Sequence, residues 1–450
     1  MTRLLRLLGV AVALASASAA PTPPTATPVP PVPPPTPKTP DLVAQFTAFN
    51  ANYTAELADL TSSLTAAYAS FGALVQQHPE ANTTCAVQRF TECKLQLVTT
   101  ANFSLGWTIL REIELLLDAP PDTWPDDGQS PVDGGWGTCY HAFHWRLEAS
   151  YDAISDLADQ GLAPALPVTL FDRVNSPDAL LAWLRAQTNV DVPRTGTNTV
   201  IAANDGNANL LRLIHKQLPA TYAWHPGLWA ALANFTLHEW RDGASGAWGP
   251  TYAMPDGSRL AVPDLSTTFH IAKYYGEYGI DVGMWSALAA TTVGFVGVPF
   301  PWGQLLPDGT PWNHNLYDTA TLFALAWPAA SPVARAAMAA QSATWLNFTL
   351  STLAEDGAWP RSKYDETAET AQYYGAGALG KFGFFNESAC FWQPAPSSCH
   401  LGRSRKARST IYDSVAANML GKLAASHGKG SYYTSALDAI GLTIPLELRG

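Results

Sequence analysis

The chain has 450 residues, of which 14% are charged and 47% are hydrophobic, and its formal net charge is −11 at pH 7. This charge argues against a nucleic-acid partner and against binding an anionic membrane by bulk charge. An anionic substrate is still possible, because a local group of basic residues acts within about one Debye length.

The N-terminus is typical of a secreted protein. Residues 1–20, MTRLLRLLGVAVALASASAA, have a basic start, a short apolar centre and a small-residue end, which predicts a signal peptide. Residues 21–40 are rich in proline and predict an extended linker. We therefore expect one folded domain over 41–450, extracellular and N-glycosylated, with no membrane span. The N-x-S/T sequons are at Asn52, Asn82, Asn102, Asn234, Asn347 and Asn386.

The five cysteines fit the same compartment. Cys85 and Cys93 are close in sequence, as are Cys390 and Cys399, so we expect two small disulfide loops. Cys139 is then left over, and its pairing is open.

Helical patterning runs through the chain in order, first over about 41–77 and 88–118. From residue 255 a repeat of about fifty residues follows: an acidic-Gly turn, a polar segment, an aspartate and an apolar-periodic helix. The second helix of each unit is expected over 226–240, 283–296 and 330–354. The repeated aspartates are Asp264, Asp318, Asp365 and Asp413.

Each repeated aspartate stands before an apolar run and is expected to be the N-cap of a helix. A repeat of stacked helical hairpins predicts an all-α fold. We expect about six to seven hairpins to close into an α/α toroid, and the alternative is an open solenoid. If the units are equivalent, the positive helix ends converge on one face, which favours anions.

The polar residues around the aspartate differ from one repeat unit to the next. This suggests that the units contribute to one shared site, in which each supplies side chains with a different chemical role. The second copy supplies Trp312, Asn313, His314, Asn315 and Tyr317, and the third supplies Trp359, Arg361, Lys363 and Tyr364. The helices that follow the aspartates add His270, Lys273, Tyr274, Tyr373 and Tyr374.

Other signals are weaker. His141 and His144 have the i, i+3 spacing of a metal pair, but no third ligand is apparent, so we expect no metal and no cofactor. Asp242, Asp356 and Glu366 are candidate carboxylates for glycoside hydrolysis. Asp242 and Asp356 are also the acidic residues that turns favour.

In its Asn-His element and its later Arg and Tyr positions, the chain resembles the α/α-toroid polysaccharide lyases that act on alginate and glucuronan. In those families an Asn-His element lies in the cleft with an Arg and a Tyr from a later repeat. The resemblance implies catalytic roles for Asn313, His314 and Arg361, with Tyr364, Tyr373 or Tyr374. Trp312 stands where the family pattern has another Asn.

The implied reaction is β-elimination from a uronic-acid polymer by a monomeric enzyme. Amide, imidazole and guanidinium donors neutralise the C5 carboxylate, and Tyr or His exchanges the protons at C5 and O4. The remaining candidates, Trp312, Asn315, Tyr317, Trp359, Lys363, His270, Lys273 and Tyr274, would bind the polymer. The alternatives are a glycoside hydrolase on the same fold and a non-catalytic carbohydrate-binding protein. A terpene-cyclase-like toroid fits less well, since its acid-rich motifs are missing.

Overall fold

The computed structural model describes residues 40–97, 102–190, 199–253, 259–298, 303–306, 309–360, 368–393, 399–401, 403, 405–425 and 442. The expected signal peptide and nearly all of the linker lie outside these residues. So do Arg361, Lys363, Tyr364, Asp365 and Glu366.

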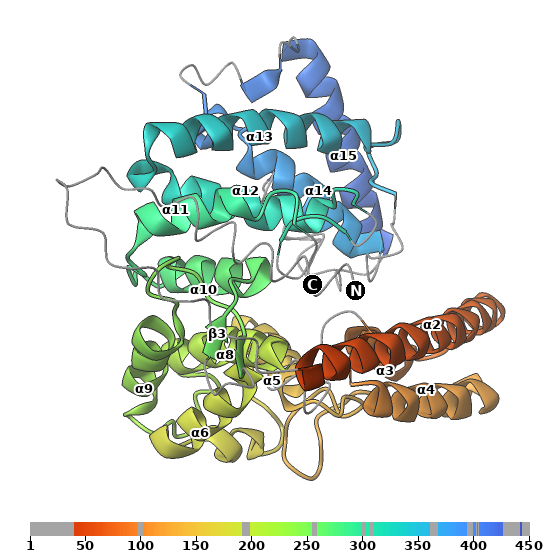
Figure 1. Cartoon of the computed structure of the whole chain (residues 1–450). Helices are drawn as coiled ribbons and strands as arrows, with labels where there is room; N and C mark the ends of the chain where they lie inside the picture. Colours follow the sequence, from red (N-terminus) through yellow and green to blue (C-terminus); the bar gives the residue numbers. More distant parts are fainter. Residues whose placement is uncertain are drawn as a thin grey trace, which may run out of the picture. The chain divides into compact units, whose positions relative to one another are not determined.

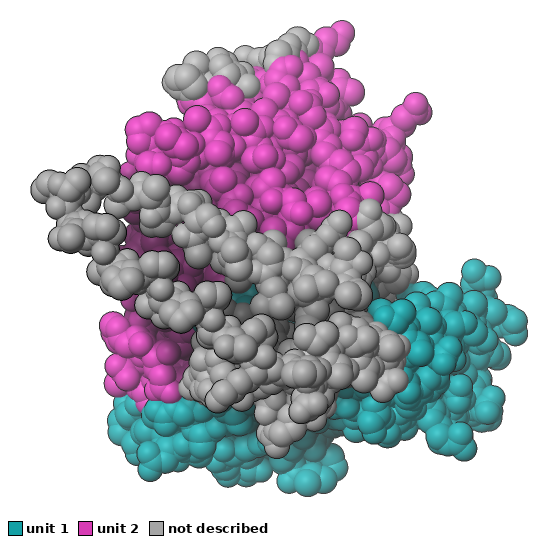
Figure 2. Space-filling view, in the orientation of Figure 1, with its two compact units in different colours: residues 1–228, 250–262 teal, residues 229–249, 263–450 magenta. Residues whose placement is uncertain are grey.

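The described chain is predominantly helical, as the sequence predicts, and three strands of two or three residues accompany the helices (Figure 1). It divides into two compact units (Figure 2). Unit 1 comprises residues 1–228 and 250–262, and unit 2 comprises 229–249 and 263–450. A single catalytic domain over 41–450 stays a prediction.

Unit 1 begins with three helices, α2 (Pro40–Gln77), α3 (Thr84–Leu95) and α4 (Phe103–Asp118). They share a core that includes Leu60, Phe90 and Ile109. The single helical stretch expected over 88–118 is thus two helices. The break has a local cause: Asn102 is the N-cap of α4, and its side chain accepts a hydrogen bond from the Leu105 N–H.

The rest of unit 1 contains α5 (Phe143–Asp159), α6 (Pro177–Thr188) and α8 (Val200–Lys216), with the 3-10 turns η2 (Pro121–Thr123) and η3 (Leu170–Val174). Helix α8 contacts both α5 and α6. Strand β2 (Thr251–Ala253) pairs in parallel with β1 (Asn189–Val190) and antiparallel with β3 (Arg259–Ala261).

Unit 2 consists of consecutive helices. They are α9 (Leu228–Asn234), the π-helix η4 (Phe235–Trp240), α10 (Leu265–Glu277), α11 (Trp285–Gly294), α12 (Asn313–Ala326), η5 (Trp327–Ala329), α13 (Pro332–Ser351), α14 (Ala368–Lys381), η6 (Glu387–Ala389) and α15 (Arg405–Ala425). Helix α12 is central, since it contacts α10, α11, α13 and α14 (Figure 1). The helices expected over 226–240, 283–296 and 330–354 are α9 with η4, α11 and α13.

The N-cap prediction is confirmed at one aspartate. The Asp264 side chain accepts a hydrogen bond from Thr267 N–H at 2.7 Å and starts α10. It is wrong at Asp318 and Asp413, which lie inside α12 and α15. The better start signal is proline: Asp264 and Trp312, the N-caps of α10 and α12, each directly follow a proline. The residue after Pro311 is extended, so α12 begins well before Asp318.

One disulfide prediction is also wrong. Cys85 pairs with Cys139, not with Cys93, whereas Cys390 pairs with Cys399 as expected. Cys93 is a buried free thiol whose Sγ contacts the Gly106 carbonyl oxygen at 3.4 Å. Because Cys93 lies inside helix α3, its side chain faces the core of the three helices and not a loop.

Candidate functional site

Three neighbouring helices of unit 2 bring polar side chains together. Residues three or four apart share one face of a helix, so the i, i+3 and i, i+4 spacings of His270, His314 and their neighbours place them side by side. We call the resulting set the His314 cluster. It comprises His270, Lys273 and Tyr274 of α10; Trp312, His314, Tyr317 and Asp318 of α12 and its N-cap; and Tyr373, Tyr374 and Lys381 of α14.

His314 is held between two aromatic side chains. Its ring stacks on Tyr374, with centroids 3.8 Å apart and planes 8° apart. Trp312 meets it edge-on at 4.6 Å. The side chain is 21% exposed, so it is fixed in orientation and still accessible to a ligand.

Asp318 lies one helical turn after His314 and is fully buried. One of its carboxyl oxygens is 3.7 Å from His314 Nε2, and neither oxygen accepts a hydrogen bond from a described residue. Burial raises the pKa of Asp318 well above its usual range; nearby Lys273 opposes the shift and Asp264 adds to it. A buried acid beside a partly exposed imidazole is the kind of pair that functional sites contain.

Tyr317 and Tyr373 form a pair of phenols across α12 and α14. The Tyr373 hydroxyl donates to the Tyr317 hydroxyl at 3.2 Å. Burial, with the neighbouring Tyr373, raises the pKa of Tyr317 well above 10, so Tyr317 stays a neutral phenol. Gly377 permits this approach, because a Cβ there would lie 2.8 Å from the Tyr317 ring.

Two lysines flank the Tyr317 ring, each with Nζ 5.8 Å from its centroid. Lys273 also lies 4.9 Å from the Tyr274 ring and 4.0 Å from a Glu277 carboxylate oxygen. Burial lowers the pKa of Lys381, and the charge of Lys273 lowers it further. Two lysines thus lie near one phenol ring, and Glu277 offsets part of their charge.

His270 belongs to the cluster through Tyr274. Their rings lie parallel, with centroids 5.9 Å apart. His270 and Tyr274 are both partly exposed, as are Tyr373 and Tyr374. The accessible rim of the cluster is thus aromatic and basic, which suits a sugar that carries a negative charge.

Three of the expected site residues have structural contacts instead. The Asn313 carboxamide accepts a hydrogen bond from the Thr349 hydroxyl at 3.0 Å, which ties α12 to α13. Asn315 is buried and donates to the Gln304 carbonyl at 2.8 Å. Trp359 is buried, and its indole N–H donates to the Thr349 carbonyl at 3.0 Å.

Sequence reasoning missed two members of the cluster, Asp318 and Lys381. Asp318 was assigned to a helix cap, although its i, i+4 spacing from His314 was the signal for a pair on one helix face. Lys381 gave no such signal, since it lies two turns beyond Tyr373 at the end of α14.

The other sequence candidates lie apart from the cluster. Asp242 and Asp356 accept hydrogen bonds from the Ser245 and Ala358 N–H groups and so serve their turns. Burial lowers the pKa of His144 to about 3, while His141 lies between Glu92 and Glu112. Within the part of the chain that the structure describes, no group of three or more His, Cys, Asp or Glu residues is arranged to hold a metal ion.

No helix in the described ranges is long and apolar enough to cross a bilayer. Comparison of the chain with models of protein families, with curated proteins and with solved structures found no match.

Proposed function

We propose that this protein is a secreted polysaccharide lyase that cleaves a uronic-acid polymer of the alginate or glucuronan type by β-elimination. One observation carries the proposal: two partly exposed imidazoles, three partly exposed phenols and two lysines converge from α10, α12 and α14. These are the groups that neutralise a carboxylate and move protons in such a reaction.

The first task is to make the C5 proton acidic. The carboxylate on C5 must lose its charge before the carbanion can spread onto it. Lys273, Lys381 and His314 are the cationic or donor groups of the cluster. Arg361 and Lys363, which precede α14 in sequence, add positive charge in this proposal. Asn313 acts indirectly, because its bond to Thr349 fixes the start of α12.

The second task is proton transfer. Tyr373 removes the C5 proton or protonates O4, with Tyr374, Tyr364 and His314 as the other candidate acids or bases. Tyr317 supports Tyr373: as a neutral phenol hydrogen-bonded to it at 3.2 Å, it stabilises the phenolate that forms when Tyr373 has given up its proton. Trp312, Tyr274 and His270 supply ring faces for the sugar.

The setting of the proposed enzyme follows from the rest of the chain. The consecutive helices α12 and α13 are in contact, as the two helices of a toroid hairpin are. Two disulfides and six sequons favour an oxidising, extracellular compartment. The proposed enzyme acts as a monomer and needs no cofactor.

The test is the ultraviolet absorbance of the product. Elimination leaves a conjugated C4–C5 double bond that absorbs, whereas hydrolysis does not. We expect absorbance to grow with alginate or glucuronan and to be lost in His314→Ala. The matched control is His238→Ala, at an exposed position of η4 outside the cluster, which should keep full activity. Equal loss in both variants would leave His314 without a specific role, and no absorbance with any polyuronate would refute the lyase.

A glycoside hydrolase is the second candidate, and Asp318 favours it. Burial raises its pKa, which favours the protonated carboxyl of a general acid, and because Asp318 is fully buried, His314 at 3.7 Å would carry the proton to the sugar. New reducing ends without absorbance, lost in Asp318→Asn, would support this reading. Binding of a polymer with neither signal would instead indicate a carbohydrate-binding protein.

A further inference from the structure

Unit 1 contains a pocket that the proposed reaction does not use. Its volume is about 250 Å³, and it is lined by loop residues that precede α5, by the start of α5 and by η3. Pockets for drug-sized ligands begin at about 300 Å³, so this one suits a single sugar residue and not an oligosaccharide. Arg173 and the Asp133–Arg146 ion pair line it, and Phe143 and Leu170 contribute its apolar lining.

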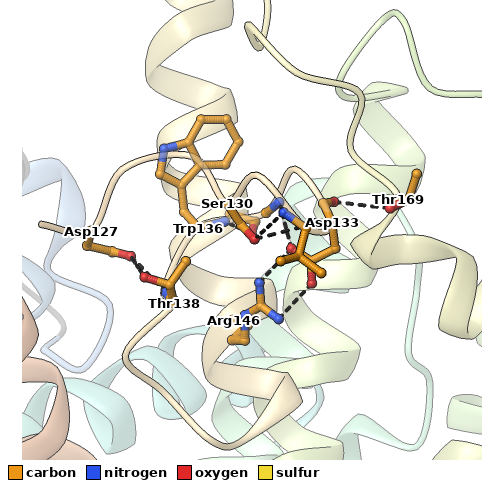
Figure 3. A network of polar contacts seen from close by, with 10 residues as sticks. Asp127, Ser130, Asp133, Trp136, Thr138, Arg146 and Thr169 are labelled. Carbon is orange, nitrogen blue, oxygen red and sulfur yellow. Dashed lines mark hydrogen bonds and ion pairs between the residues drawn. The ribbon is translucent and has the colours of Figure 1, made fainter. Parts of the chain in front are cut away.

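The loop beside the pocket is held by many polar contacts (Figure 3). Asp133 accepts from both terminal nitrogens of Arg146 at 2.7 and 2.8 Å, and its carbonyl accepts from the Thr169 N–H at 2.8 Å. Gly134 has φ +67°, and a Cβ there would lie 1.9 Å from the Pro167 carbonyl oxygen. Asp127 fixes the loop further along, since it accepts from the Thr138 N–H at 2.8 Å. The pocket wall is therefore formed before any ligand arrives.

The charges around the pocket are mostly paired, with one exception. Arg146 is neutralised by Asp133, and the His141 ring lies 3.2 Å from both Glu92 and Glu112. Arg173 is exposed, and no carboxylate of the described chain forms an ion pair with it. Its guanidinium lies 4.7 Å from the centre of the Phe143 ring. This cation–π contact orients the guanidinium and leaves its hydrogen-bond donors for another partner.

We infer that this pocket is a second carbohydrate site, which binds one carboxylate-bearing sugar through Arg173. A guanidinium matches a carboxylate with two parallel hydrogen bonds, and Leu170 provides apolar contact for the ring carbons. The choice of a uronic acid as the ligand rests on the proposed function. Free glucuronate and the end residue of a polyuronate present the same carboxylate.

The test is isothermal calorimetry on the full-length protein. The ligands are sodium glucuronate, a short oligoglucuronate and glucose. We expect the two acids to bind, glucose not to bind, and affinity to fall as salt rises. Arg173→Gln should weaken binding by about ten- to a hundredfold, because a charge-assisted hydrogen-bond pair is lost. Arg173→Lys should restore part of it. Tighter binding of the oligomer than of the monosaccharide, lost in Arg173→Gln, would identify a polymer end as the ligand.

The control is Arg111→Gln, which removes an exposed arginine of α4 in the same unit. It should bind as the wild type does, and circular dichroism should show that all variants fold. Equal binding by wild type and Arg173→Gln, or no saturable binding, overturns the inference. Lyase absorbance is measured separately and should survive in Arg173→Gln. If no polymer gives absorbance while Arg173-dependent binding persists, the proposed function alone has failed.

Discussion

Tyr373 carries the hydroxyl that the proposed elimination uses, and its removal tests that role at the scale of one residue. Tyr373→Phe keeps the ring contacts with Tyr317 and Tyr374 but deletes the hydrogen bond to Tyr317. Because proton transfer is lost and sugar contact is not, kcat should fall by about 10² to 10⁴ with little change in KM. Initial rates from product absorbance give both quantities.

The matched control for this change is Tyr412→Phe. Tyr412 is a partly exposed tyrosine of α15 whose ring contacts Phe385 and lies outside the cluster. Its substitution should leave kcat and KM unchanged. A Tyr373→Phe enzyme with normal kcat would remove Tyr373 from the mechanism and make Tyr374, Tyr364 or His314 the acid or base.

At the same scale, sequence periodicity predicted much of the His314 cluster. His270, Lys273 and Tyr274 share one helix face by their spacing, and the structure places Lys273 near the Tyr317 ring and the His270 ring parallel to Tyr274. The direction of each side chain was harder to predict. Asn313 and Asn315 stand on either side of His314 in sequence, but the helix turns by about 100° per residue, so they face Thr349 and Gln304 instead.

At the scale of an element, helix α10 begins at a buried carboxyl group. Burial raises the pKa of Asp264 from 3.8 to about 7, and the hydrogen bonds from Thr267 and Ser266 offset only part of this. The folded chain therefore keeps a proton that the unfolded chain loses above about pH 4. Stability falls as pH rises from about 4 to 7, because the folded state binds more protons in that window.

Asp264→Asn should remove this contribution to the pH dependence. Asparagine caps a helix about as well as aspartate but does not ionise. We expect the variant to match the wild type near pH 4 and to be more stable at pH 8, by on the order of 4 kcal/mol at most. Thermal melting across this range measures the difference. The control is Asp413→Asn, at an exposed position of α15, which should keep the wild-type dependence of stability on pH. If Asp264→Asn also kept that dependence, the raised pKa of Asp264 would be contradicted.

The helices themselves were largely predictable, and their starts were not. The pattern placed α11 and α13 within a few residues, because apolar periodicity reports which face is buried. Aligning the repeats on aspartate misplaced the start of α12, since a polar side chain inside a buried face looks like a cap in the sequence. A proline directly before the N-cap marks the starts of α10 and α12, where Asp264 and Trp312 are extended and lie outside the helix.

At the scale of the whole molecule, each unit has its own core and its own disulfide. The core around Leu60 and Ile109 and the Cys85–Cys139 bond belong to unit 1, and the core around Phe323 and Trp345 and the Cys390–Cys399 bond belong to unit 2. Cys85–Cys139 links residues 54 apart, so it joins the α2–α4 helices to the segment before α5. Such a bond restricts the unfolded chain more than a short loop would.

This pairing predicts which cysteine carries the free thiol. Burial, with the neighbouring Glu92, raises the pKa of Cys93 to about 12, so the folded protein should react slowly with an alkylating reagent. Alkylation in denaturant without reductant, followed by digestion and mass spectrometry, should label Cys93 alone. Cys93→Ala should show no labelled cysteine and keep both disulfides. Label on Cys139 would instead mean that Cys85 pairs with Cys93, which would require the Cys93 side chain to leave the core of α2, α3 and α4.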